Sequence, residues 1–413
     1  MTPFPTAAPA DRMLHSSGRR RHAAAVGVAL LALAAGAVRP ARAAAPKDQL
    51  TPVLAAVLAP PRAVPLTDGR WQVPYELELT NVTDAPMTIE SVEVRDPHRG
   101  GALVASLGAA DIAKNLRIPG ATGGATLDAA QGAVLFIDLS FAGAGEIPKG
   151  LEHWITVTTP NPKGTMPPRM VEEVARAAVG TAAPIVLAPP LRGGRWVAAA
   201  SCCDSYHRHA ILPVDGRRTV AQRFAIDWMQ LADDGRPVDG DPAKNESYPQ
   251  FGREVLAVAN AKVVRVVDGL PEQKPGALPA DTTISNADGN SVVLDLGSGN
   301  FALYAHMQPG SIRVHEGDRV RRGQVLGLLG NTGNSSAPHL HFHVMDGPSP
   351  LASNGLPYVI DRFEIRGEAV SQDELDSELT KTPSQPVEIR AVAGPARRTK
   401  QLPADLAVIE FAP

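Results

Sequence analysis

The sequence is poor in aromatic residues and in net charge, and each shortage excludes a class of protein. Aromatic residues fill only 4% of the 413 positions, so aliphatic side chains must supply most of the core. A formal net charge of −3 provides no dense basic face, which excludes nucleic acid as a partner. The 44% hydrophobic content excludes wholesale disorder, and the length suggests two to three domains.

Cysteines are equally scarce, since only Cys202 and Cys203 occur and they are adjacent. Neighbouring cysteines cannot join distant segments, so a fold stapled by disulfides is excluded. Their spacing also excludes a zinc site of the Cys-x-x-Cys type. A disulfide between the two neighbours, two free thiols and pairing between chains remain as alternatives.

Long apolar runs are limited to one segment near the N-terminus. Three arginines at 19–21 precede the apolar residues 23–38, and a small-x-small pattern follows at 41–43. This order is typical of a secretory signal peptide, and the run is shorter than the ~20 residues that span a bilayer. We therefore predict a signal peptide over residues 1–43, with an uncleaved anchor as the alternative. The mature protein should be periplasmic or secreted and carry no stable membrane span.

The remaining chain reads as short strands between turn clusters, which predicts a mostly β protein. Residues 47–160 suggest an Ig-like β-sandwich, in which alternating residues of WQVPYELELTNVT face the core. Residues 161–200 are rich in Pro and Ala and read as a connector with a short helix over MVEEVARAAV. Dense strand signals over 201–348 predict a second β domain, and residues 349–413 an extension packed on it.

Three histidines alternate on one predicted strand of the second domain. In PHLHFHVM, His339, His341 and His343 lie two residues apart, so a strand places all three on one face. A polar sheet face is the plain interpretation. A His-x-His pair on a strand also allows two imidazoles to reach one metal ion.

The segments around these histidines resemble the lysostaphin/LytM-type zinc metallopeptidases. The resemblance rests on a Tyr-x-His strand at 304–306, glycine-containing loops at 317–324 and 330–333, and His-Leu-His-Phe at 339–342. It covers roughly residues 210–348. It implies an antiparallel LytM-type β domain with one zinc ion in a groove.

The resemblance also implies a role for each matching residue. In that family the second His of His-x-His and the Asp of a His-x-x-x-Asp motif bind the metal, which implies His341 and Asp227 as ligands. The first His of the pair and the His of Tyr-x-His act on the substrate carbonyl and the attacking water. This implies catalytic roles for His339 and His306, with zinc activating the water.

One position departs from the family pattern. Arg223 stands four residues before Asp227, where the family has its first zinc-binding His, and a guanidinium does not ligate metals. Because a catalytic zinc normally has three protein ligands, either the site is lost or another residue replaces that His. The candidate replacements are His207, His209 and His343.

Turn chemistry ranks the three candidates. Asp215-Gly216 is a strong two-residue hairpin signal, which pairs Val214 with Arg217. Continuing this register places His207 opposite Phe224, beside the vacated position, provided that a bulge turns it inward. We therefore predict His207 as the third ligand, followed by His209 and then His343.

Two functions from different classes follow. The first is an exported zinc metalloendopeptidase that hydrolyses peptide bonds of peptidoglycan cross-links; the retained histidines favour it. The second is a non-catalytic LytM-type domain that binds or activates a cell-wall amidase; Arg223 favours that one. Zinc content of the purified protein distinguishes them.

Overall fold

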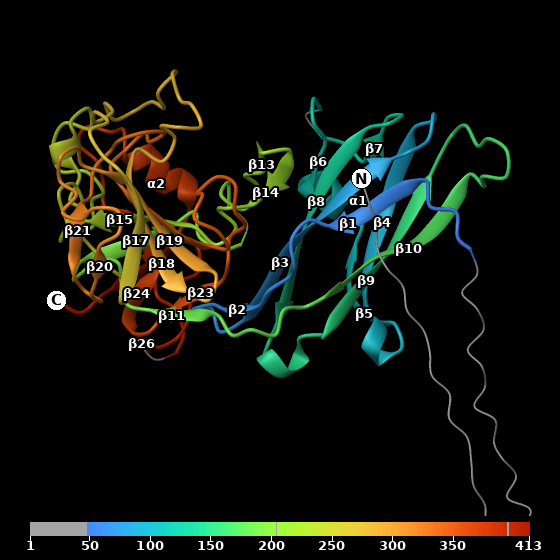
Figure 1. Ribbon diagram of the computed structural model, residues 1–413, viewed down its shortest axis with the longest axis horizontal. Coiled ribbons are helices and arrows are strands. Elements are labelled where there is room, and N and C mark those ends of the chain that lie inside the picture. Colours follow the sequence, from blue (N-terminus) through green and yellow to red (C-terminus); the bar gives the residue numbers. More distant parts are fainter. Residues whose placement is uncertain (1–47, 122, 204, 395) are drawn as a thin grey trace, which may run out of the picture. The chain divides into compact units, whose positions relative to one another are not determined.

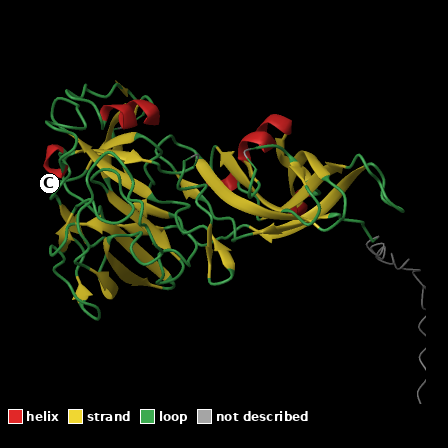
Figure 2. Ribbon diagram, turned by 90° about the horizontal axis from the view of Figure 1, so that it is seen from above, coloured by secondary structure: helices red, strands yellow, loops and turns green. Residues whose placement is uncertain are grey.

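The described chain is built mainly from β-strands, with only short helices (Figures 1 and 2). The structure, a computed structural model, describes residues 48–413 apart from 122, 204 and 395. The predicted signal peptide, residues 1–43, lies outside the described residues. Within the described residues, no helix is long and apolar enough to cross a membrane.

Two antiparallel sheets share a hydrophobic core in the N-terminal part and form the expected sandwich. The first sheet consists of β1 (Val53–Val57), β2 (Val64–Pro65), β3 (Trp71–Asn81), β6 (Leu116–Arg117) and β8 (Gly132–Phe141). The second consists of β4 (Met87–Asp96), β5 (Ala102–Leu107), β7 (Thr126–Leu127), β9 (Gly150–Thr158) and β10 (Arg169–Ala178).

Strand β3 shows how the sequence builds this core. Val73, Tyr75, Leu77 and Leu79 are fully buried and belong to the core between the two sheets, as their alternation predicts. Each such side chain contributes roughly 1.5–3 kcal/mol when it leaves water. The residues between them point to the other face of the sheet, where Glu76 lies.

The helix predicted over MVEEVARAAV is wrong, because this segment is strand β10. It pairs antiparallel with β9 from Arg169↔Thr158 onwards. Met170 and Glu172 are buried while Arg169, Val171 and Glu173 are exposed, which is the period of a strand. The free edge of β9 thus overrides the helix propensity of Ala, Glu and Arg. Residues 161–200, expected as a connector, contain this edge strand.

A larger antiparallel sheet organises the rest of the chain. In spatial order its path is β20-β17-β18-β19-β22-β15-β12-β27-β24-β25, and β26 also pairs with β24. Its strands are β12 (Arg195–Ala199), β15 (Ile226–Leu231), β17 (Ala261–Val267), β18 (Asn290–Gly297), β19 (Asn300–Met307), β20 (Arg319–Val320), β22 (Leu340–Met345), β24 (Phe363–Ala369), β25 (Ile389–Arg390), β26 (Arg397–Arg398) and β27 (Ala407–Glu410). Residues 349–413 therefore extend this sheet with four of their own strands, since β27 pairs with β12.

Short elements complete the structure. Three two-stranded pairs join β11 (Ile185–Leu187) to β23 (Tyr358–Ile360), β13 (Leu212–Val214) to β14 (Arg217–Thr219), and β16 (Glu254–Leu256) to β21 (Val325–Leu328). The helices are α1 (Ala109–Asn115), α2 (Gln372–Glu378) and the 3₁₀ turns η1 (Pro97–Arg99), η2 (Ala144–Glu146) and η3 (Asn245–Ser247).

Candidate metal centre

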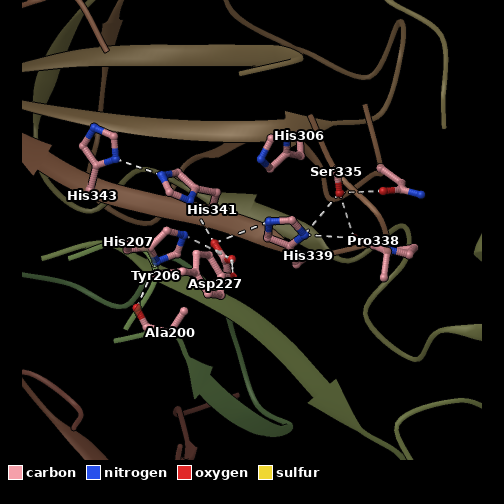
Figure 3. A network of polar contacts seen from close by, with 12 residues as sticks. Ala200, Tyr206, His207, Asp227, His306, Ser335, Pro338, His339, His341 and His343 are labelled. Atoms are coloured by element: carbon pink, nitrogen blue, oxygen red, sulfur yellow. Dashed lines mark hydrogen bonds and ion pairs between the residues drawn. The ribbon is translucent and has the colours of Figure 1, made fainter. Parts of the chain in front are cut away.

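The centre of the site is Asp227 on β15, which lies between β22, the strand that carries His341, and β12, the strand that leads towards His207. On one side β22 pairs Asp227 with His341, and the carboxylate Oδ1 lies 2.8 Å from His341 Nδ1. On the other side β12 pairs Asp227 with Ala199, where the chain leaves the sheet towards His207. Figure 3 shows the rings of His207, His339 and His341 around this carboxylate.

His207 lies in a turn that folds back over the end of β12. Its Nδ1 lies 2.9 Å from the carbonyl oxygen of Ala200, and its Nε2 lies 3.3 Å from Asp227 Oδ2. A carbonyl can only accept, so Nδ1 carries a proton, and Nε2 is the nitrogen that faces Asp227. The hydroxyl of Tyr206 donates to the same Oδ2 at 2.6 Å (Figure 3).

His339 and His306 lie on the other side of His341. His339 Nδ1 lies 2.8 Å from Ala337 O, and its Nε2 lies 3.4 Å from Asp227 Oδ1. His306, near the end of β19, has its Nδ1 2.7 Å from Thr332 O. Both Nδ1 atoms therefore donate to carbonyls, so Nε2 is the nitrogen of each ring that remains available to the site. The two ring centroids are 4.7 Å apart.

The backbone of His306 is unusual for a residue with a side chain. Its φ is 63°, in the left-handed region that non-glycine residues rarely adopt. Such strain persists only where the surroundings hold it, and it concentrates at functional sites. The bonds to Asp288 O and Thr332 O hold His306 from its backbone amide and its ring.

Two groups of side chains have donor atoms close enough to share a metal ion. His207, Asp227 and His341 form one group, and His306, His339 and His341 form the other. Within each group the ligand atoms lie within 4.8 Å of one another. Tetrahedral zinc with bonds near 2.0–2.1 Å separates its ligand atoms by roughly 3.3 Å. The 3.3 Å between His207 and Asp227 fits this value, and two His with one carboxylate are a common catalytic zinc set.

Burial and charge set the protonation of these groups. Burial opposes ionisation of Asp227, but His207 and His339 outweigh it and hold the pKa of Asp227 well below its usual value. Burial lowers the pKa of His341, and burial together with His339 and His341 lowers that of His306 strongly. The neutral imidazoles and the ionised carboxylate are the forms that bind metals. At His339 the charge of Asp227 outweighs burial and raises the pKa.

A cavity of about 580 Å³ opens onto this site, and both catalytic candidates line it together with the metal-ligand candidates. Helix α2 and the residues after it provide another wall through Asp376, Leu379 and Thr380. Neither Tyr206 nor this wall is among the site residues predicted from the sequence. Tyr206 could have been suspected because it directly precedes His207. No local sequence pattern indicates that helix α2 and the residues after it line the cavity.

Residues 247–353 match the sequence model of Peptidase family M23. They form an M23 domain. The matched range contains His306, His339, His341 and His343, whereas His207 and Asp227 lie before it. The family is one of lysostaphin/LytM-type peptidoglycan endopeptidases, as the resemblance implies.

Curated relatives with endopeptidase names match this chain over short segments. Peptidoglycan DD-endopeptidase ShyA of Vibrio cholerae is 32% identical over 100 residues, which are 23% of this chain and 23% of that protein. DD-carboxypeptidase/endopeptidase Mpg of Neisseria meningitidis is 35% identical over 86 residues, 20% of this chain and 19% of that protein. The chain thus spans only 23% and 19% of the lengths of these two relatives.

Among solved structures, the catalytic domain of lysostaphin from Staphylococcus simulans is 20% identical to this chain. The alignment covers 38% of this chain and 84% of that domain, with a TM-score of 0.22.

The other candidate ligands lie away from the Asp227 carboxylate. His343 shares a face of β22 with His341, but it lies beyond His341, with its Nδ1 2.9 Å from His341 Nε2 (Figure 3). His209 packs edge-on against Phe136 of the sandwich at 4.7 Å. Neither belongs to a metal-compatible group among the described residues of the M23 domain and its surroundings.

The hairpin prediction is confirmed at the turn, but its continuation is wrong. Val214 pairs with Arg217 as expected, and the ladder ends at Leu212↔Thr219. His207 therefore does not lie across a strand from Phe224. A turn at 221–224, and not a bulge, separates β14 from β15. The neighbouring strand β12 brings His207 to Asp227 instead, because Ala199 pairs with Asp227.

Arg223 is fully occupied elsewhere. Its Nη2 and Nε both donate to the Glu76 carboxylate of the sandwich, the latter at 3.2 Å, and both side chains are buried. The two cysteines are joined to each other by a disulfide in the segment before Tyr206. Neither Arg223 nor a free thiol is therefore presented to the metal centre.

Proposed function

We propose that this protein is an exported zinc metalloendopeptidase that hydrolyses peptide bonds of peptidoglycan cross-links. One observation carries the proposal: His207, Asp227 and His341 gather as a zinc-compatible group beside His306 and His339 in one cavity. The M23 relatives named above supply the substrate class. The predicted signal peptide supports a periplasmic or secreted location.

The three ligand candidates suit zinc by their chemistry and their second partners. His207 would bind through Nε2 while Ala200 O holds Nδ1, and His341 would bind through Nδ1 while His343 contacts Nε2. Such outer partners orient ligating histidines and fix their tautomers. Zinc, when bound, supplies a Lewis acid towards water and the peptide carbonyl.

The remaining histidines handle protons and charge. The Nε2 atom of His339 lies 3.4 Å from Asp227 Oδ1, and Asp227 raises the pKa of His339. His339 would take the proton of the attacking water at this atom, where Asp227 stabilises the imidazolium. His306 has a strongly lowered pKa and stays neutral. Its Nδ1 is held by Thr332 O, so its ring orients water or substrate through Nε2.

The test combines metal analysis with digestion of purified peptidoglycan. We expect one zinc per chain and new peptide termini in the digest by mass spectrometry. Both should be lost in His207→Ala, while His209→Ala serves as the matched control in the same turn. A protein that binds zinc but cuts no peptide bond contradicts the proposed activity.

A second function is favoured by Arg223 in the position of the family's first zinc ligand. In that reading the M23 domain is non-catalytic and binds or activates a cell-wall amidase. If this second function holds, the purified protein should contain no zinc and should increase the rate at which an amidase releases stem peptides. Stoichiometric zinc together with peptide-bond cleavage excludes it.

A further inference from the structure

A buried carboxylate of the sandwich faces the segment that carries His207. Glu76 lies on β3 between the core residues Tyr75 and Leu77, so its side chain points to the opposite face of the sheet. It has no exposed surface, and it accepts hydrogen bonds from both Arg208 and Arg223. A buried carboxylate persists only when it is paired in this way.

Arg208 is fixed by a complete set of partners. Besides Glu76, its guanidinium donates to Tyr75 O at 2.8 Å, to Ile137 O at 3.3 Å and to Asp138 Oδ1 at 3.2 Å. It also lies over the Phe136 ring, with Cζ 4.9 Å from the centroid. Two arginines thus face two carboxylates, which balances the charge of the cluster.

Arg208, which is held by Glu76, directly follows the candidate ligand His207 in one turn. Tyr206 and His207 contact Asp227, whereas Arg208 reaches Glu76 and His209 packs on Phe136. The turn is closed by hydrogen bonds from His209 N to Tyr206 O and from Ala210 N to His207 O. Holding Arg208 against β3 therefore sets where His207 points.

We propose that Glu76 is a positioning residue of the metal centre. It neutralises Arg223, which stands where the family has a histidine, and it anchors Arg208 so that His207 reaches Asp227. The sandwich then helps to position the metal centre. This inference rests on the proposed zinc site.

The experiment compares Glu76→Gln with Glu78→Gln. Glu78 lies on the same face of β3 and pairs with Arg218 of β14. The side chains of this pair are about one-third exposed, and Arg218 lies outside the turn that carries His207. Zinc affinity is measured by competition with a chromogenic chelator, and the ligand geometry by the visible spectrum of the cobalt-loaded protein. Removing a group that contacts a metal ligand typically weakens metal binding about 10–100-fold. Glu76 acts on His207 through Arg208, so we expect a loss at the lower end of that range and an altered spectrum for Glu76→Gln. Glu78→Gln should match the wild type in both.

Folding is followed by circular dichroism of the metal-free variants, and Glu76→Asp keeps the charge if Glu76→Gln fails to fold. We expect folded Glu76→Asp to bind zinc more weakly than the wild type and more tightly than Glu76→Gln. A folded variant with wild-type affinity and spectrum overturns the inference, and so does a loss of zinc seen only with unfolding. A wild-type protein without zinc overturns the proposed function itself, which separates the two failures.

Discussion

Arg223 directs its guanidinium at the carboxylate of Glu76, 147 residues earlier in the chain, and both side chains are excluded from water. The position that the sequence resemblance equates with the family's first zinc-binding histidine is thus taken by one half of a buried ion pair. The imidazole nearest the second oxygen of Asp227 comes from His207, in a different segment. The predictions below separate this arrangement from a simply degenerate site.

Restoring the family histidine should not restore the family site. Arg223→His removes one partner of Glu76, while Arg208 remains, so we expect the free energy of unfolding to fall by about 2–3 kcal/mol. Like His207→Ala alone, the double variant Arg223→His/His207→Ala should bind no zinc, because the side chain at position 223 faces Glu76 and not the metal centre. Chemical denaturation and metal analysis check both statements. Stoichiometric zinc in the double variant would show that position 223 can still reach the metal.

The three candidate third ligands should differ in rank. We expect His207→Ala to weaken zinc binding more than roughly 100-fold, beyond the usual loss of an outer partner. His343→Ala should cost about 10-fold, because His343 contacts the far nitrogen of His341. His209→Ala should retain wild-type affinity. Chelator competition on the three proteins measures the order, and a greater loss in His343→Ala than in His207→Ala contradicts it.

Replacing either catalytic candidate should strongly reduce activity without removing zinc, unlike replacing a metal ligand. His339→Ala and His306→Ala should each lower kcat/KM on a cross-linked muropeptide by about 10²–10⁴-fold, the range of general acid–base catalysis, and keep one zinc per chain. Steady-state cleavage and metal analysis on the same preparations test this. Loss of zinc from His339→Ala would favour the second metal-compatible group, which His339 shares with His306 and His341.

The cysteine pair should be dispensable for the metal. Cys202 and Cys203 are bonded to each other, and thiolates rather than disulfides bind zinc. We therefore expect a Cys202→Ala/Cys203→Ala variant to fold and to contain the same zinc as the wild type. Treatment of the wild type with a reductant is the control. If the alanine variant contained no metal, a thiolate would be the missing ligand.

Acid should destabilise the sandwich through His153. Its ring lies between Tyr75 OH at 2.8 Å and Ala175 O at 2.9 Å, and burial lowers its pKa from 6.5 to about 4. The unfolded chain takes up this proton below pH 6.5, whereas the folded chain does so only near pH 4. Stability attributable to His153 is thus present above pH 6.5 and falls by about 3 kcal/mol as the pH drops to 4. His153→Gln should show a shallower decline in denaturation series across this range.

Several features were predictable because they depend on neighbours in the chain. The alternation in β3 identifies its buried face, and Asp215-Gly216 sets the pairing of its own hairpin. The motif residues His306, His339, His341 and Asp227 line one cavity. Local rules failed for residues 170–179, where Ala and Glu favour a helix. The open edge of β9 makes that segment a strand, and an edge is a property of the folded sheet.

The sequence by itself determined the strand pattern, the placement of alternating histidines on one face of β22 and the family of the second domain. Each of these depends on residues that are close together in the chain. Only the tertiary structure decided which histidine joins Asp227 and what becomes of Arg223. His207 reaches Asp227 because β12 pairs with β15, and Arg223 turns away because a carboxylate from β3 is buried beside it. Both outcomes depend on contacts between segments far apart in the chain. Desolvated charges and open strand edges must find partners wherever the fold offers them, and no local pattern records where that is.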